Sequence, residues 1–184
     1  MNMKSWHTRA FFATLLAAAL APLGASAATS TIAATAVAPT APTTFQLKQL
    51  TPEAALLAAQ AALAACRKAG YQVAVAVVDR AGVTQVLLRD RLAGPHTVEV
   101  APRKAWTAAS LKIPTTAFAN ETQAGKPLSG LRALPQFMAV GGGLPIEGGG
   151  NLFGGIGVSG APGGDADEAC AAAGVRAISD ELEF

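Results

Sequence analysis

His96 is the residue of this chain with the clearest capacity for coordination or proton-transfer chemistry. It lies in the stretch GPHTVEVAPRKAW, where Gly94 and Pro95 interrupt regular structure and Thr97 can cap a helix. The chain has two histidines, and His7 lies in an N-terminal segment that we expect to be removed. Zinc or iron sites built from two or more histidines are therefore excluded within one mature chain.

Other catalytic motifs in the sequence are incomplete. Ser159, in GVSGAPG, lacks the G-x-S-x-G spacing of a hydrolase nucleophile. The segment GGIGVSG contains G-x-G-x-x-G, but it falls at the end of an expected strand rather than in an early strand-helix unit. GGGLPIEGGG lacks the Lys-Ser/Thr ending of a phosphate loop. We therefore expect these glycines to permit sharp turns and close backbone approach.

A single imidazole is sufficient to hold haem, whose iron needs one protein ligand and whose ring gains affinity from apolar burial. Tyr71, Met138 and the cysteines are the other possible iron ligands. Trp106 could stack on a ring, although an aromatic residue on a helix more often fills a core. Four cations that could meet propionates flank the histidine in sequence: Arg89, Arg91, Arg103 and Lys104. The residues alone leave open that His96 is an ordinary loop residue.

Hydrophobic spacing and turn residues predict the elements that must position His96. Thr51 and Pro52 predict the start of a helix that ends at Gly70. Pro102 is expected to kink or restart the helix that Thr97 caps. The remaining elements are strands at 71–79, 83–89, 136–140 and 151–160, a helix within 113–125 and a helix at 165–182, with a glycine-rich excursion at 141–150. This order, helix-strand-strand-helix-helix-strand-strand-helix, predicts an α+β domain with an antiparallel sheet.

The N-terminus is typical of a secretory signal peptide. Residues 1–27 combine a basic start, a short apolar run and the small-residue site ASA, and the apolar run is shorter than the roughly 20 residues that span a bilayer. The Ala/Thr/Pro-rich residues 28–44 predict a flexible tether, and residues 45–184 the folded domain. We expect a periplasmic or secreted protein with no membrane span after cleavage.

Charge and cysteine content narrow the partners further. Two of the 14 basic residues lie in the signal peptide, so the remainder balances the 12 acidic residues and the formal net charge falls from +2 to zero. A chain with zero net charge lacks the broad positive potential that attracts the phosphates of nucleic acids, so nucleic acid is not an expected partner. Cys66 and Cys170 could pair in an oxidising compartment or remain buried thiols, and their spacing does not decide between the two.

Several segments, taken in order, resemble the GlcG/HbpS family of haem-binding and related proteins. They are LTPEAALLAAQAALAACRKAGYQVAVAVVDRAG, GPHTVEVAPRKAWTA, IPTT, GGGLPI, GGIGVSG and DEACAAAG, and the resemblance covers about Leu50 to Leu182. It implies a GlcG-like (profilin-like) α+β fold, symmetric homo-oligomers and haem binding, with a sensor or transport partner. It also implies a relationship to domains of corrinoid metabolism.

This resemblance directs attention to the junction between the loop and the helix, with His96 as the expected iron ligand. The expected cofactor-binding residues are His96, Thr97, Glu99, Arg103 and Lys104. A second hypothesis is a non-haem enzyme or metabolic accessory protein, in which Glu99, Arg103 and Lys104 hold a small carboxylate or corrinoid-related ligand. A third is an oligomeric scaffold, in which the two cations make subunit contacts. We expect a binding protein rather than an enzyme, because one histidine without paired carboxylates offers few proton-transfer groups.

Overall fold

The computed structural model describes residues 42–182. The chain divides into two units between Thr43 and Thr44. The expected signal peptide, and the tether as far as residue 41, lie outside the described residues. Within the described residues, no helix has the length and apolar character needed to cross a membrane.

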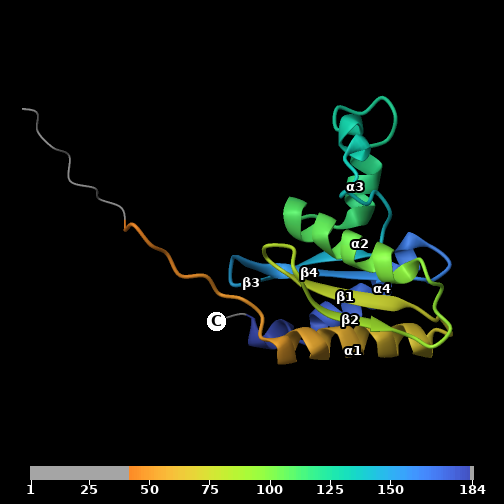
Figure 1. Cartoon of the computed structure of the whole chain (residues 1–184), viewed down its shortest axis with the longest axis horizontal. Helices are drawn as coiled ribbons and strands as arrows, with labels where there is room; N and C mark the ends of the chain where they lie inside the picture. The colour runs from red at the N-terminus through yellow and green to blue at the C-terminus, as the bar shows by residue number, and fades with distance from the viewer. Residues whose placement is uncertain (1–41, 183–184) are drawn as a thin grey trace, which may run out of the picture. The chain divides into compact units, whose positions relative to one another are not determined.

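The described residues form four α-helices and a four-stranded antiparallel sheet of order β2-β1-β4-β3 (Figure 1). This confirms the predicted α+β class and the predicted element order. The elements are α1 (Pro52–Lys68), β1 (Ala74–Asp79), β2 (Thr84–Arg89), α2 (Thr97–Leu111), α3 (Thr115–Glu121), β3 (Gly143–Gly148), β4 (Asn151–Ser159) and α4 (Gly164–Arg176), with 3-10 helices η1 (Ser129–Ala133) and η2 (Ser179–Glu181).

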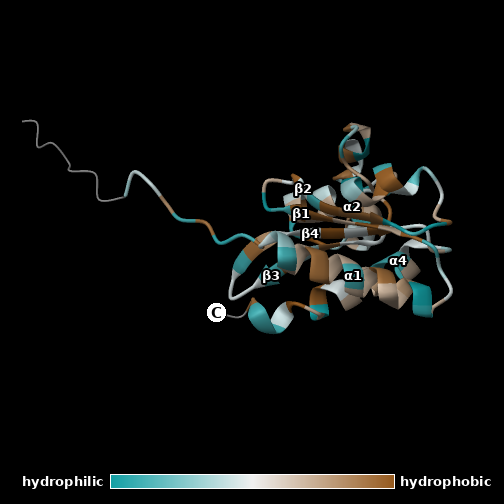
Figure 2. Ribbon diagram, turned by 60° about the horizontal axis from the view of Figure 1, so that its bottom comes forward, coloured by the Kyte–Doolittle hydropathy of each residue, from teal (hydrophilic) through white to brown (hydrophobic). Residues whose placement is uncertain are grey.

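The sheet lies between two helical layers, α2 on one face and α1 with α4 on the other (Figures 1 and 2). The pleat of β1 explains this division, because alternate side chains of a strand point to opposite faces. Val75 and Val77 belong to the main core with α1 and α4, whereas Ala74 and Ala76 pack against Ala101 of α2. The small side chains on the α2 face allow this helix to approach closely.

Glycines of β4 make the contact with α2 closer still. A Cβ atom at Gly157 would stand 2.1 Å from the carbonyl oxygen of Ala101, and one at Gly155 would stand 2.4 Å from that of Ala105. Only hydrogen in place of a side chain allows such proximity. This confirms that the G-x-G-x-x-G segment serves backbone packing.

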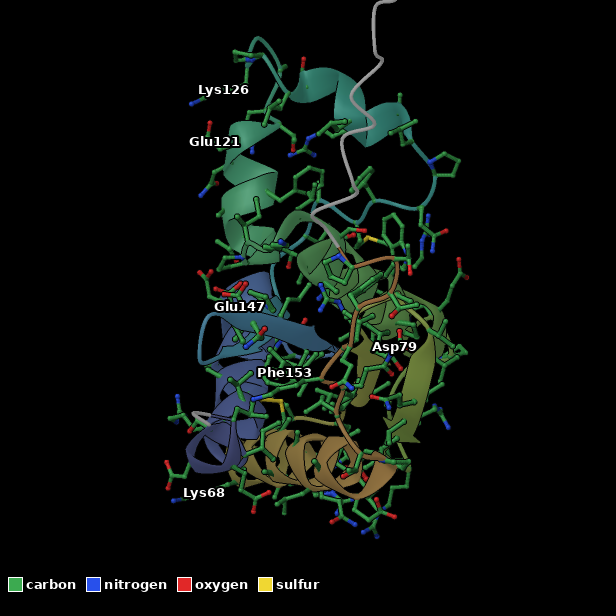
Figure 3. All side chains as sticks on the ribbon, turned by 90° about the vertical axis from the view of Figure 1, so that its left-hand side faces the viewer. Lys68, Asp79, Glu121, Lys126, Glu147 and Phe153 are labelled. Carbon is green, nitrogen blue, oxygen red and sulfur yellow. A yellow bond between two sulfur atoms is a disulfide. The ribbon has the colours of Figure 1, made fainter. Side chains whose placement is uncertain are left out.

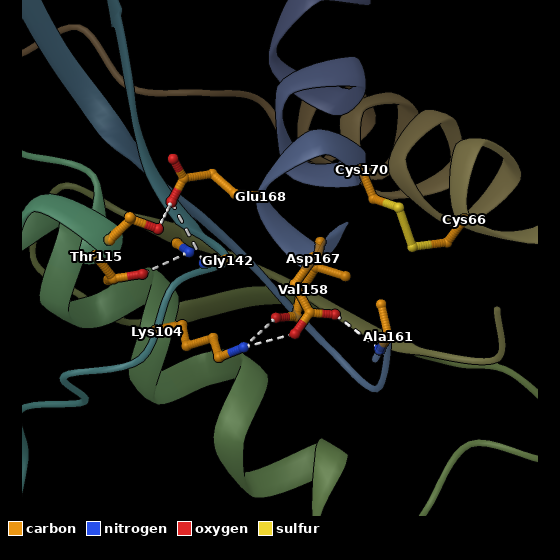
Figure 4. A network of polar contacts seen from close by, with 11 residues as sticks. Cys66, Lys104, Thr115, Gly142, Val158, Ala161, Asp167, Glu168 and Cys170 are labelled. Atoms are coloured by element: carbon orange, nitrogen blue, oxygen red, sulfur yellow. Dashed lines mark hydrogen bonds and ion pairs between the residues drawn. A yellow bond between two sulfur atoms is a disulfide. The ribbon is translucent and has the colours of Figure 1, made fainter. Parts of the chain in front are cut away.

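A disulfide joins the two helices on the opposite face of the sheet. Cys66 of α1 and Cys170 of α4 are bonded across a sequence separation of 104 residues (Figures 3 and 4). Both side chains are buried. At the start of α1, the side chain of Thr51 accepts a hydrogen bond from the Ala54 amide, as predicted for a helix cap. The Cys66–Cys170 bond resolves the alternatives that the sequence left open.

Three predicted elements need correction. Residues 136–140 are not a strand, and the edge strand β3 instead occupies Gly143–Gly148, inside the glycine-rich stretch. The C-terminal helix ends at Arg176 and is followed by η2, so it does not continue to residue 182. Helix α2 runs from Thr97 to Leu111 without a restart at Pro102, where only the Val98 carbonyl loses its helical donor.

Candidate functional site

His96, and not Thr97 as predicted, occupies the N-cap position of α2. Its backbone is in the right-handed helical region (φ −65°, ψ −23°), and its side chain makes no capping hydrogen bond. The residue is exposed, and the imidazole makes no hydrogen bond within the part of the chain that the structure describes. The ring lies over Gly94, whose missing Cβ would be 2.8 Å from Nδ1 of His96. An exposed imidazole without a hydrogen-bond partner is available to a ligand.

Thr97, the next residue, is fully buried and holds the turn that carries His96. Its Oγ1 donates a hydrogen bond to the Gly94 carbonyl oxygen at 2.7 Å, and its amide donates to the same oxygen at 3.1 Å. A Cβ at Gly160 would stand 3.4 Å from the Thr97 methyl group. The hydroxyl is therefore directed into the protein and committed to the backbone.

Glu99 and Arg103 lie one and two turns further along α2, on the same side as His96. Their side chains form an ion pair of 3.3 Å between Glu99 Oε1 and Arg103 Nη1, and the Glu99 side chain is 75% exposed. The Arg103 guanidinium also donates to the carbonyl oxygen of Pro135. His96, Glu99 and Arg103 thus form one accessible row.

Lys104 lies on the opposite side of α2, facing the sheet and α4. Its Nζ donates to Asp167 Oδ2 at 2.8 Å and to the carbonyl oxygen of Val158 at 2.9 Å (Figure 4). Asp167 Oδ1 accepts from the Ala161 amide, and burial raises the pKa of Asp167 despite the adjacent amine. The amine of Lys104 is directed into the interior and is occupied by these contacts. The five expected site residues therefore divide into a surface row, in which His96 and Glu99 are exposed and Arg103 is half-buried, and a buried pair, Thr97 and Lys104.

Sequence analysis did not identify Asp167 as the partner of Lys104. The only signal was an acidic residue in the first turn of the predicted C-terminal helix, a position that usually reflects the helix dipole. A separation of 63 residues carries no pairing information without the fold. Glu168, the next residue, accepts a hydrogen bond from Thr116 Oγ1 at 2.6 Å and was likewise not singled out.

The other residues proposed as iron ligands lie away from His96 in the chain and differ in environment. Tyr71 lines a hollow of about 360 Å³ between α1 and α4, beside the disulfide. Met138 is half-buried, and its amide donates to Thr107 Oγ1. Both cysteines are consumed by the disulfide. A second hollow, of about 310 Å³, lies at the start of α1 and includes Phe153. Neither hollow includes His96.

The sequence stretch that carries His96 instead presents exposed apolar side chains. Leu92 is 76% exposed and Val98 is 36% exposed. Arg91, in the same loop, is also exposed. Trp106 is occupied elsewhere: it packs over the turn at Gly82 and meets Phe137 edge to face, with ring centroids 5.3 Å apart. No group of three or more His, Cys, Asp or Glu side chains that could hold a metal ion occurs among residues 42–182.

Comparison with known proteins places these observations in context. The family described as "Haem degrading protein HbpS-like" matches residues 50–176. A double mutant of HbpS from Streptomyces reticuli is 42% identical, covers 78% of this chain and 99% of its own, and superposes with a TM-score of 0.70. A PduOC:heme complex is 30% identical and covers 71% of this chain and 96% of its own, with a TM-score of 0.67. The predicted fold of the GlcG/HbpS type is thus confirmed.

A curated relative carries a different name. The corrinoid adenosyltransferase PduO of Salmonella typhimurium is 36% identical over 103 residues, which are 55% of this chain and 31% of PduO. The chain therefore spans about a third of the length of the curated PduO proteins that it matches.

Proposed function

The chain belongs to the HbpS-like family of haem-degrading proteins, and from this premise we propose that it binds haem at the start of α2, with the His96 imidazole as an iron ligand. The observation that carries the proposal is an exposed imidazole that makes no hydrogen bond within the described residues. The similar PduOC chain, crystallised as a haem complex, supports the ligand class. The family description names degradation of haem; the proposal concerns the binding step that such a reaction requires.

The residues around His96 fit the chemistry of haem. Imidazole nitrogen is a common protein ligand of haem iron, and bound haem supplies a redox-active iron centre. Leu92 and Val98 offer apolar surface to a macrocycle. Arg103, oriented by Glu99, and the exposed Arg91 offer cations to propionate groups. Thr97 and Lys104 are buried and would act indirectly: Thr97 fixes the turn before α2, and Lys104 anchors α2 to α4.

A second copy of the chain is the proposed cover for this surface. Haem gains affinity from burial of its apolar faces, and the side chains beside His96 are exposed in one chain. A homo-oligomer that encloses His96 would supply the missing wall. Light scattering after size-exclusion chromatography should give a mass above one chain, and Leu92→Asp should lower that mass and weaken haem binding together. A monomer that binds haem fully would contradict this part of the proposal.

We also propose that the protein works in the periplasm or outside the cell, where a sensor or transport partner would exchange haem with it. The supporting observation is the disulfide between Cys66 and Cys170, because such bonds persist in oxidising compartments. Mass spectrometry of the protein recovered from an exporting host should find an N-terminus at Ala28 and no free thiol. An intact Met1 with two free thiols would contradict export.

The second candidate ligand is a corrinoid, which the likeness to part of PduO favours. Corrinoids and haem are both tetrapyrrole macrocycles whose metal accepts an imidazole, so the same residue is available to either. The carboxylate ligand of the second sequence hypothesis is tested beside them. The ligands differ in absorbance, which makes one titration series decisive.

The deciding experiment is a titration of the full chain with haem, with cobalamin and with glycolate, followed by absorbance and by thermal unfolding. His96→Ala is the test variant, and His7→Ala, made in the uncleaved full chain, is the control for haem binding by the other histidine. We expect saturable haem binding with a shifted Soret band, a shift lost in His96→Ala and kept in His7→Ala. A Soret shift that persists unchanged in His96→Ala would keep haem as the ligand and move the iron ligand to Tyr71 or Met138. Absence of saturable haem binding would overturn the proposal, and selective cobalamin or glycolate binding would replace it.

A further inference from the structure

The absence of a side chain at Gly94 determines where the His96 imidazole can lie. A Cβ built on Gly94 would stand 2.7 Å from Cε1 and 2.8 Å from Nδ1 of the ring, closer than real Cβ atoms approach. Gly94 is not among the residues with positive φ, so its backbone conformation is open to other residues. The glycine at this position is therefore explained by the ring that lies over it.

Thr97 fixes the other side of the same turn. Its amide and its Oγ1 both donate to the Gly94 carbonyl oxygen, at 3.1 and 2.7 Å. Because Thr97 is fully buried, these hydrogen bonds are shielded from competing water. Pro95, between them, restricts φ to one narrow range. The backbone beneath the ring is thus held at Gly94, at Pro95 and at Thr97, the first residue of α2.

We infer that Gly94 and Thr97 are positioning residues for the His96 imidazole: Gly94 leaves the space that the ring occupies, and Thr97 locks the turn that presents it. This inference rests on the proposed function, in which His96 is the group that touches iron. It assigns Thr97 to positioning and not to ligation, because its hydroxyl is buried and donates to the Gly94 carbonyl. Residues that orient a metal ligand in this way typically change affinity by about 10- to 100-fold when replaced.

Gly94→Ala is the direct test, because the backbone accepts alanine and the ring at the surface is free to move aside. We expect the full-chain variant to keep its thermal stability, to lose the contact between ring and residue 94, and to bind haem about tenfold more weakly. Gly130→Ala is the matched control: nothing lies within 4 Å of a Cβ there, and its φ is also not positive. The control should leave haem affinity unchanged.

The ring position is measurable without haem. In the parent chain, the nuclear Overhauser effect between His96 Hε1 and the Gly94 α-protons should be strong. In Gly94→Ala, the effect between His96 Hε1 and the methyl protons of residue 94 should be weak. His7→Gln removes the other histidine signal. A ring that stays in place in Gly94→Ala would overturn the inference. This readout stands even if the chain proves not to bind haem, which would overturn the proposed function instead.

A double-mutant cycle tests whether the effect passes through the imidazole. In a His96→Ala background, Gly94→Ala should cause no further loss of haem affinity. An equal loss in both backgrounds would show that Gly94 acts by another route and would overturn the inference.

Thr97→Val removes the hydroxyl donor at similar volume and should lower the affinity for haem. Thr97→Ser keeps the hydroxyl and should bind haem with the affinity and the Soret position of the parent chain. A Thr97→Ser variant that behaves like Thr97→Val would contradict the role of the hydroxyl.

Discussion

The amine of Lys104 lies 2.8 Å from Oδ2 of Asp167, and each side chain is at most 5% exposed. The amine also donates to the Val158 carbonyl, and the carboxylate accepts from the Ala161 amide. The pair thus joins α2 to the first turn of α4 across the end of β4 (Figure 4). Because α2 also carries His96, this buried pair fixes the helix that presents the candidate ligand.

Removing one partner of this pair should be strongly destabilising. In Lys104→Met the Asp167 carboxylate remains buried without its cation, and we expect a loss of about 3 kcal/mol in the free energy of unfolding. Urea denaturation followed by circular dichroism measures this loss. The matched control is Glu99→Gln, which breaks the exposed pair with Arg103 and should cost less than about 1 kcal/mol.

The double variant Lys104→Met/Asp167→Leu separates charge from packing. Removing both charges should recover part of the loss, because neither ion then remains buried without its partner. A double variant as unstable as the sum of the single variants would contradict coupling between the two side chains.

The role of Lys104 shows where sequence analysis stops. A lysine on a helix usually faces solvent, so its placement among cofactor-binding cations beside Arg103 was the natural expectation. The helical period places Lys104 on the face of Thr97 and Ala101 and separates it from Glu99 and Arg103. What the sequence lacks is the partner, because Asp167 reaches Lys104 only once α4 has packed against the sheet.

The edge strand shows a second limit. Residues 136–140 have the apolar composition of a strand, yet they form a loop after η1 in which Phe137 packs against Trp106 and Phe118. β3 contains glycine because a Cβ at Gly143 would stand 2.4 Å from the Lys104 carbonyl oxygen. Glycine is unfavourable in strands by intrinsic preference, but the close approach of the Lys104 carbonyl to Gly143 requires it in β3.

The Thr51 cap of α1 and the buried strands β1 and β4, which depend on local pattern, were predicted correctly. The predicted Thr97 cap of α2 was wrong, because the helix begins at Thr97 and His96 is its N-cap.

Acid should weaken the fold through Asp90. Arg67 donates to both carboxylate oxygens, at 2.7 and 3.0 Å, and these hydrogen bonds lower the pKa of Asp90 to about 2. The unfolded chain binds this proton more tightly, so the stabilisation is present above the ordinary value of 3.8 and is lost as pH falls through about 2. Asp90→Asn should therefore destabilise the protein at neutral pH and make little difference near pH 2.

Urea unfolding between neutral pH and pH 2 measures the difference in the free energy of unfolding between the parent chain and Asp90→Asn. This difference should become smaller as the pH falls. Glu121→Gln is the control, since Glu121 and Lys126 form an exposed pair 3.8 Å apart, both labelled in Figure 3. Exposed ion pairs contribute little to the free energy of unfolding, so Glu121→Gln should unfold at the same urea concentration as the parent chain. A constant gap between the parent chain and Asp90→Asn at all pH values would contradict the role assigned to the Asp90 carboxylate.

Two glycines with nearly the same backbone test the packing of Trp106. Gly82 (φ +81°) and Gly70 (φ +84°) both occupy the left-handed region, so alanine costs about 1 kcal/mol of backbone strain at either position. At Gly82 the new Cβ would also stand 2.3 Å from Cδ1 of Trp106, whereas nothing lies within 4 Å at Gly70. Gly82→Ala should therefore be the more destabilising by about 1–3 kcal/mol.

Tryptophan fluorescence in a Trp6→Phe background reports Trp106 alone, because the chain has two tryptophans. Its emission should shift in Gly82→Ala and stay unchanged in Gly70→Ala. Equal stabilities and equal spectra for the two variants would show that the indole does not rest on the turn.

The disulfide should account for a large part of the stability of the domain. Cys66 and Cys170 enclose a segment of about a hundred residues, so the bond removes much conformational entropy from the unfolded chain. We expect Cys66→Ala/Cys170→Ala to lose about 2–4 kcal/mol in the free energy of unfolding. Dithiothreitol should destabilise the parent chain by a similar amount and leave the double variant unaffected. A parent chain equally stable with and without reductant, with its thiols demonstrably free, would show that α1 and α4 hold together by packing alone. It would also remove the structural support for a role in an oxidising compartment.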